Sequence, residues 1–151
     1  MSTTNDNNTA TFLHLSALSQ YVIPFGNFIL PIIIWSSSKD KSAYVDRQGK
    51  EAINFQLSLF LYSILLVLIA VPIFIIVLAK GLSASDLNND GDFILQNFDF
   101  ENMSSIIVIS IIACLLFVFL KIAEFFLIIY AAVRTSSGED FRYPITIRFL
   151  K

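Results

Sequence analysis

Residues 106–133 read IIVISIIACLLFVFLKIAEFFLIIYAAV, an apolar run interrupted by only two charged residues, Lys121 and Glu124. As a continuous helix the run would be roughly 42 Å long at about 1.5 Å per residue, whereas the hydrocarbon core of a bilayer is about 30 Å thick. We therefore expect this segment to cross a membrane, either tilted or projecting from it.

Two further apolar runs precede this one. Residues 55–79 are rich in Leu, Ile and Val and end at Lys80, and we expect Pro72 to kink the helix that they form. Residues 12–35 form the other run, but Pro24 and Gly26 predict a break near its middle. In a bilayer such a break is tolerated where protein or water satisfies the freed backbone groups.

The composition of the chain agrees with a membrane protein. Of its 151 residues 56% are hydrophobic, against roughly 45–50% in globular proteins, and 15% are charged. The sequence thus predicts an all-α integral membrane protein with three transmembrane helices in a single domain, residues 12–151. Residues 1–11 are polar and lack Lys and Arg, so we expect a flexible tail and not a secretory signal. The net charge of −2 argues against nucleic acid as a partner.

The basic residues predict the orientation of the chain. Eight of the ten lie in the loop after the first run or in the tail 134–151: Lys39, Lys41, Arg47, Lys50, Arg134, Arg142, Arg148 and Lys151. Lys and Arg mark the cytoplasmic side, so three spans would leave the N-terminal tail outside and the C-terminus in the cytoplasm. A re-entrant first segment, with both ends in the cytoplasm, is the alternative that the break allows.

Charged and polar side chains within the runs are candidate functional residues. Lys121 and Glu124 are three residues apart, near the middle of a span, where a charge costs about 2.5–3.5 kcal/mol. They can form a structural pair or inter-subunit contact, and the alternative is an ion or proton pathway. Around the break, a second group of polar or helix-breaking residues should face protein: Ser16, Ser19, Gln20, Pro24, Gly26 and Asn27.

Two cytoplasmic stretches, residues 45–56 and 141–149, suggest an interaction surface. Their candidate contact residues are Asp46, Gly49, Glu51, Asn54, Gln56, Arg142, Tyr143, Pro144 and Arg148. Asp46 can cap a helix that continues into the second span, and Asn27 is the expected partner of the polar face that includes Glu51 and Asn54. The tail alternates apolar with polar residues, so it could lie on the membrane or add a strand to a partner.

The remaining features give no catalytic site. Asp86, Asn88, Asp90 and Asp92 match the first part of a calcium loop, but position twelve is Asn97, so a solvated acidic turn is the expected structure. Cys114 is expected to be a packing residue and His14 an interfacial hydrogen-bonding residue. Metal-spaced ligands, nucleophile motifs and phosphate loops are absent from the sequence. We therefore expect no enzyme activity and no cofactor.

Several motifs resemble a known family. They are His14-Leu-Ser-Ala-Leu, Ile23-Pro-Phe-Gly-Asn, Leu30-Pro-Ile-Ile-Ile-Trp35, residues 45–56 and Tyr143-Pro-Ile-Thr-Ile-Arg-Phe149. The chain resembles small bacterial membrane proteins classed as a domain of unknown function, a family described as similar to the twenty-kilodalton Tic subunit of the chloroplast import machinery. The resemblance implies the bacterial inner membrane and suggests a role in protein translocation or insertion.

These observations predict a non-catalytic membrane subunit, a scaffold or accessory factor of a larger assembly. Its expected partners are the lipid bilayer, other membrane proteins and further copies of itself. The alternative is a small oligomeric transporter or channel that uses Lys121 and Glu124.

Overall fold

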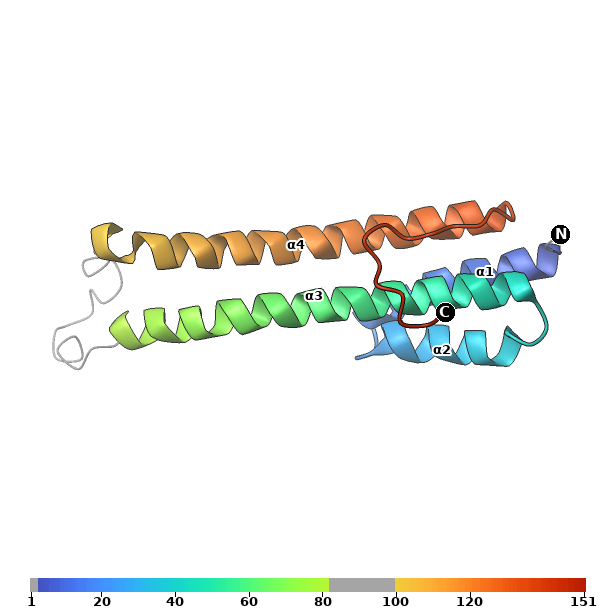
Figure 1. Cartoon of the computed structure of the whole chain (residues 1–151), viewed down its shortest axis with the longest axis horizontal. Helices are drawn as coiled ribbons and strands as arrows, with labels where there is room; N and C mark the ends of the chain where they lie inside the picture. Colours follow the sequence, from blue (N-terminus) through green and yellow to red (C-terminus); the bar gives the residue numbers. More distant parts are fainter. Residues whose placement is uncertain (1–2, 82–99) are drawn as a thin grey trace. The chain divides into compact units, whose positions relative to one another are not determined.

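The structure is a computed structural model that describes residues 3–81 and 100–151 (Figure 1). Every regular element in these ranges is a helix: α1 (Thr4–Ser16), the 3-10 helix η1 (Ala17–Tyr21), α2 (Gly26–Ser38), α3 (Ala43–Gly81) and α4 (Phe100–Ser136). The chain divides into two compact units. We call Met1–Leu61 together with Leu120–Lys151 the head unit, and Tyr62–Phe119 the apolar unit.

The N-terminal residues are helical, where the sequence predicted a flexible tail. Helix α1 begins at Thr4 because Thr3 and Asp6 form a capping box, in which each side chain accepts a hydrogen bond from the other residue's backbone amide. The bond from the Thr3 amide lowers the pKa of the Asp6 carboxyl. Ala10 and Leu13 are fully buried, so α1 belongs to the core of the head unit.

The first apolar run does not form one continuous helix. Helix η1 ends at Tyr21 and α2 begins at Gly26, so the break lies where Pro24 and Gly26 predicted it. Phe25, directly before α2, has a left-handed backbone with φ of 60°. A Cβ atom on Gly26 would lie 2.8 Å from the backbone oxygen of Ser19, which shows how closely η1 and α2 approach.

Helices α1 and α2 form an antiparallel hairpin within the head unit. Ser19 contacts Gly26 near the break, while Ile34 and Trp35 at the other end of α2 pack on the cluster that contains Leu13. Helix α2 has 13 residues, about 20 Å, which is too short to cross a bilayer. A third transmembrane helix is therefore not confirmed.

Among the residues that the structure describes, α3 and α4 are the two helices long and apolar enough to cross a membrane, over Ala43–Pro72 and Val108–Ser136. Both helices are strongly apolar, yet only 17% of the most apolar part of each is buried. A core helix of a water-soluble protein would bury such a surface. The large exposed side chains of the apolar unit, among them Leu68, Leu115 and Phe119, instead suit contact with lipid.

The tail after α4 is extended and crosses the N-terminal half of α3 (Figure 1). Asn54 Oδ1 accepts hydrogen bonds from the amides of Phe149, at 3.1 Å, and Leu150, at 2.8 Å, and its Nδ2 donates to the Leu150 carbonyl. Ser58 Oγ accepts from the amide of Ile147 at 2.8 Å. Two side chains of α3 thus satisfy tail backbone groups that a strand would pair with a neighbouring strand.

The contact between Gly49 of α3 and Trp35 of α2 gives a first prediction. A Cβ atom at position 49 would overlap the Trp35 ring, so Gly49→Ala should cost about 1–3 kcal/mol through overpacking, against a gain in helix propensity of about 1 kcal/mol. We expect the melting temperature in mild detergent, followed by circular dichroism, to fall by about 2–6 °C. In a Trp35→Ala background, Gly49→Ala should not lower the melting temperature. Equal decreases in melting temperature in both backgrounds would refute the packing argument.

Candidate functional site

The polar side chains of the head unit form a buried network centred on His14. The imidazole is fully buried, with Nδ1 2.9 Å from Tyr143 Oη and Nε2 3.2 Å from the Gln48 amide group. With its nitrogen facing the ring, the Gln48 amide donates to Nε2 and to the Phe141 carbonyl, and accepts from the Phe141 amide. This assignment leaves Nε2 as an acceptor and Nδ1 as the donor, which is a neutral imidazole.

Burial keeps His14 neutral. Desolvation lowers the pKa of the imidazole from 6.5 to about 4. Burial also raises the pKa of its partner Tyr143 above the usual value of 10.0, and the nearby Glu124 and Glu51 carboxylates raise it further. The ring of Tyr143 stacks on Phe55 at a centroid distance of 3.9 Å. Tyr143 of the tail therefore lies between α1 and α3. Its ring is buried in the head unit and does not face the membrane.

A second set of contacts joins α1 and the start of α3 to the end of α4. Thr11 Oγ1 lies 3.4 Å from Thr135 Oγ1 and 3.5 Å from the Ala132 carbonyl. The Tyr44 hydroxyl donates to the carbonyls of Thr135 and Glu139. Sequence reasoning identified neither contact, because each connects residues more than ninety positions apart.

The charge pair of α4 is tied to η1. Lys121 Nζ lies 2.8 Å from Glu124 Oε2, and Gln20 Nε2 donates to Glu124 Oε1 at 2.8 Å. The Glu124 side chain is 1% exposed, so both of its oxygens are satisfied inside the protein. Gln20 is the one member of the predicted polar face in the first run that reaches this pair.

The other members of that face have different surroundings. Ser16 Oγ donates to the Leu13 carbonyl in its own helix, and Ser19 Oγ is buried beside Gly26 without a hydrogen-bond partner. Asn27 Nδ2 donates to Gln56 Oε1 on α3 at 2.8 Å. The sequence placed the partner of Asn27 on α3. The expected polar face of α3 has a different partner, however, because Asn54 and Ser58 bond to the backbone of the tail.

Asp46 lies inside α3 and does not cap it, because the helix already begins at Ala43. The Asp46 carboxylate accepts hydrogen bonds from Trp35 Nε1 at 2.9 Å and from Lys50 Nζ at 2.7 Å. Ser42 Oγ accepts from the Val45 amide at 3.4 Å, in the position of a cap. Asp46 thus fastens α2 to α3.

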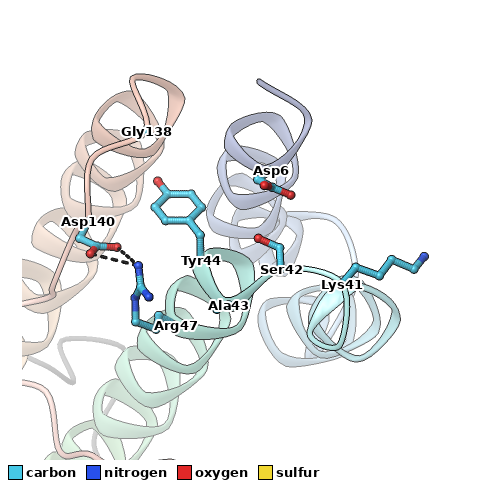
Figure 2. A pocket seen from close by; sticks show the side chains of 8 residues that line it. All are labelled: Asp6, Lys41, Ser42, Ala43, Tyr44, Arg47, Gly138 and Asp140. Carbon is cyan, nitrogen blue, oxygen red and sulfur yellow. Dashed lines mark hydrogen bonds and ion pairs between the residues drawn. The ribbon is translucent and has the colours of Figure 1, made fainter. Parts of the chain in front are cut away.

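Among the cavities on the described surface of the head unit, two are lined by several charged side chains. The first, about 410 Å³, is shown in Figure 2 and is lined by Asp6 of α1, by residues 41–44 and 47, and by Gly138 and Asp140 of the tail. Arg47 Nη2 lies 3.1 and 3.2 Å from the two carboxylate oxygens of Asp140, with Tyr44 beside this pair. Because Arg47 and Asp140 neutralise each other, the cavity offers no concentrated charge of one sign.

The second cavity, about 270 Å³, lies along the tail. Four residues of the predicted cytoplasmic surface line it on the α3 and tail sides: Glu51, Asn54, Arg142 and Arg148. Arg148 Nε is 3.9 Å from Glu51 Oε1. Pro144 lies in the turn before Ile145, which has a left-handed φ of 55°.

The described residues bring no three His, Cys, Asp or Glu side chains together in a way that could hold a metal ion. The weak calcium-loop candidates Asp86, Asn88, Asp90 and Asp92 lie outside the residues that the structure describes. Cys114, expected to be packed, is exposed on α4 in the apolar unit. The network centred on His14 is a structural core, because its buried polar groups form hydrogen bonds with one another.

Comparison with known proteins gives one match. Residues 5–150 match the model of a family described as the magnetosome magnetite crystal formation protein family. No curated protein and no solved structure matches the chain. The expected membership of a Tic-like family of unknown function is therefore wrong, because the family that covers the chain is a different one. The link to protein translocation rested on that resemblance and is withdrawn with it.

The neutral state of His14 makes the stability of the head unit depend on pH. The folded pKa is about 4 and the reference value is 6.5, so between these pH values the unfolded chain binds a proton that the folded chain does not. Stability is therefore lost as pH falls from 6.5 towards 4. We expect a loss of about 2–3 kcal/mol from this group between pH 7 and 4.5, measured by unfolding in mixed detergent micelles.

The matched variant is His14→Gln, which keeps a polar group at this position but cannot titrate. Carboxylates titrate in both proteins, so the quantity of interest is the difference between their two pH profiles. Parallel profiles would mean that His14 is not held neutral.

Proposed function

The chain belongs to the magnetosome magnetite crystal formation protein family, and on that premise we propose that it is a non-catalytic membrane protein that acts in magnetite crystal formation. The observation that carries the proposal is the extent of the match, which includes the head unit and both long apolar helices.

A scaffold or accessory role is supported by the way the head unit uses its polar residues. His14 bonds to both Gln48 and Tyr143, and Glu124 is satisfied by Lys121 and Gln20. Catalysis by acid–base chemistry needs a titratable group that can reach a substrate, whereas these groups are buried in mutual contacts. Such a core supplies a rigid surface for other membrane proteins or for further copies of the chain.

We further propose two membrane spans, α3 and α4, in place of the three expected. Helix α1 contacts Thr135 at the end of α4 and Gln48 near the start of α3, so the N-terminal segment lies at the same end as the loop 39–42 and the tail. Eight of the ten basic residues belong to residues 39–50 and 134–151 of the head unit. The positive-inside rule then favours a cytoplasmic head with both termini on that side.

The alternative, an oligomeric transporter that uses Lys121 and Glu124, has less support. Glu124 is nearly fully buried and makes two short contacts within the same head unit, which is the arrangement expected of a structural pair. A conducting site would need these groups to exchange partners with an ion or with water.

The topology can be measured with reporter fusions. We expect green fluorescent protein to fluoresce at either terminus, because it folds in the cytoplasm, and alkaline phosphatase to be active when fused after residue 90. Three spans would leave an N-terminal fluorescent protein outside and dark while the C-terminal one stays bright. That result would refute the two-span arrangement.

The role in crystal formation can be tested by deleting the gene in the native host and measuring magnetite crystals by electron microscopy. We expect fewer or smaller crystals, restored by the wild-type gene and by a Lys121→Leu/Glu124→Leu variant, since replacing both partners of an ion pair by apolar residues leaves no unpaired buried charge at Glu124. Immunoblots would verify equal abundance. Unchanged crystals, or a host that makes no magnetite, would contradict the proposal, and failure of the abundant Leu variant alone would favour the transporter.

A further inference from the structure

The cavity along the tail is a basic groove. Five basic side chains line it, Arg47, Lys50, Arg142, Arg148 and Lys151, whereas its carboxylates are those of Glu51 and Asp140. Its volume of about 270 Å³ is enough for a phosphate group together with a small alcohol. The groove therefore combines an excess of positive charge with room for an anion.

The pairing of these charges shows which cations are available. Arg47 is paired with Asp140 at 3.1 Å and Lys50 with Asp46 at 2.7 Å. Arg148 has only a long contact of 3.9 Å with Glu51, and its side chain is 58% exposed. Among the residues that the structure describes, Arg142 makes no ion pair. Arg142 and Arg148 are thus the two guanidinium groups free to bind an anion, and guanidinium groups match phosphate oxygens with two parallel hydrogen bonds.

The position of the groove along α3 indicates which anion would reach it. Glu51 is the last charged residue of α3 before Lys80, and Asn54 and Ser58 hold the tail just beyond it. The groove therefore lies where α3 changes from charged to apolar, which is the level of the headgroups if α3 spans the bilayer. Past this level α3 exposes Phe60, and the tail exposes Phe149, to the surroundings.

We propose that this groove binds the headgroup phosphate of an anionic phospholipid, with Arg142 and Arg148 on the phosphate and the acyl chains along the exposed apolar surface of α3. A soluble phosphate would use the same guanidinium groups, but it would gain nothing from the adjoining apolar side chains. The inference rests on the membrane placement proposed above. The reporter fusions test that placement separately, so lipid binding can fail while the topology holds.

The test uses the full-length protein in mild detergent, titrated with phosphatidylglycerol or phosphatidylcholine and observed by native mass spectrometry. We expect phosphatidylglycerol to bind about tenfold tighter than phosphatidylcholine, since each basic residue near an anionic surface contributes about 1 kcal/mol. Arg142→Ala/Arg148→Ala should remove this preference. Lys39→Ala/Lys41→Ala is the matched control, because it removes two charges from the same end outside the groove, and it should change the preference less than twofold.

A single change, Arg142→Gln, guards against misfolding because this side chain has no ion pair to lose, and it should weaken phosphatidylglycerol binding about fivefold. Equal losses in the groove and control variants would overturn the proposal in favour of diffuse attraction to negative charge. Equal binding of both lipids by the wild-type protein would overturn it as well. Displacement of phosphatidylglycerol by a few millimolar inorganic phosphate would show that the groove binds a soluble anion instead.

Discussion

The buried imidazole of His14 is the contact on which the head unit depends, because it joins three segments that are distant in sequence. Its two nitrogens reach Gln48 on α3 and Tyr143 in the tail. A buried ring of this kind is stable only if both nitrogens have partners, since an unsatisfied buried polar group costs about 1–3 kcal/mol. The position of α1 therefore constrains where the tail and the start of α3 can lie.

The same requirement explains why so many of the polar residues in the sequence motifs contact one another. Trp35 donates to Asp46, Asn27 donates to Gln56, and Asn54 binds the backbone of the tail. Taken from the sequence, Asp46, Asn54 and Gln56 suggested a surface for an external partner. In the structure these polar residues bond within the head unit. The basic side chains along the tail are the ones still available to bind a ligand.

The extent of what the sequence could predict follows the range of each interaction. The apolar runs, the break before Gly26 and the spacing of Lys121 and Glu124 are local, so helical geometry suffices to predict them. The hairpin of α1 and α2 depends on the packing of Ile34 and Trp35 against the cluster that contains Leu13, which periodicity does not encode. The length of the first run suggested a span, because hydropathy averages over a break that in fact reverses the chain.

The expected membership of a Tic-like family was wrong because it rested on short motifs such as residues 45–56. Proteins with different activities can share motifs of this kind when the same residues stabilise their folds.

The head unit also bears on how the two long helices stay together. Lipid tails are as apolar as Leu, so association of two apolar helices in a bilayer lacks the hydrophobic driving force available in water. Polar contacts are the remaining source of specificity, and near the end of α4 the Tyr44 hydroxyl and Thr11 both bond to it. Because Tyr44 and Thr135 are buried in the head unit, such hydrogen bonds compete with water less than they would on an exposed surface. The buried hydrogen bond between Tyr44 and the Thr135 carbonyl can thus fix the pairing of α3 with α4 in the head unit.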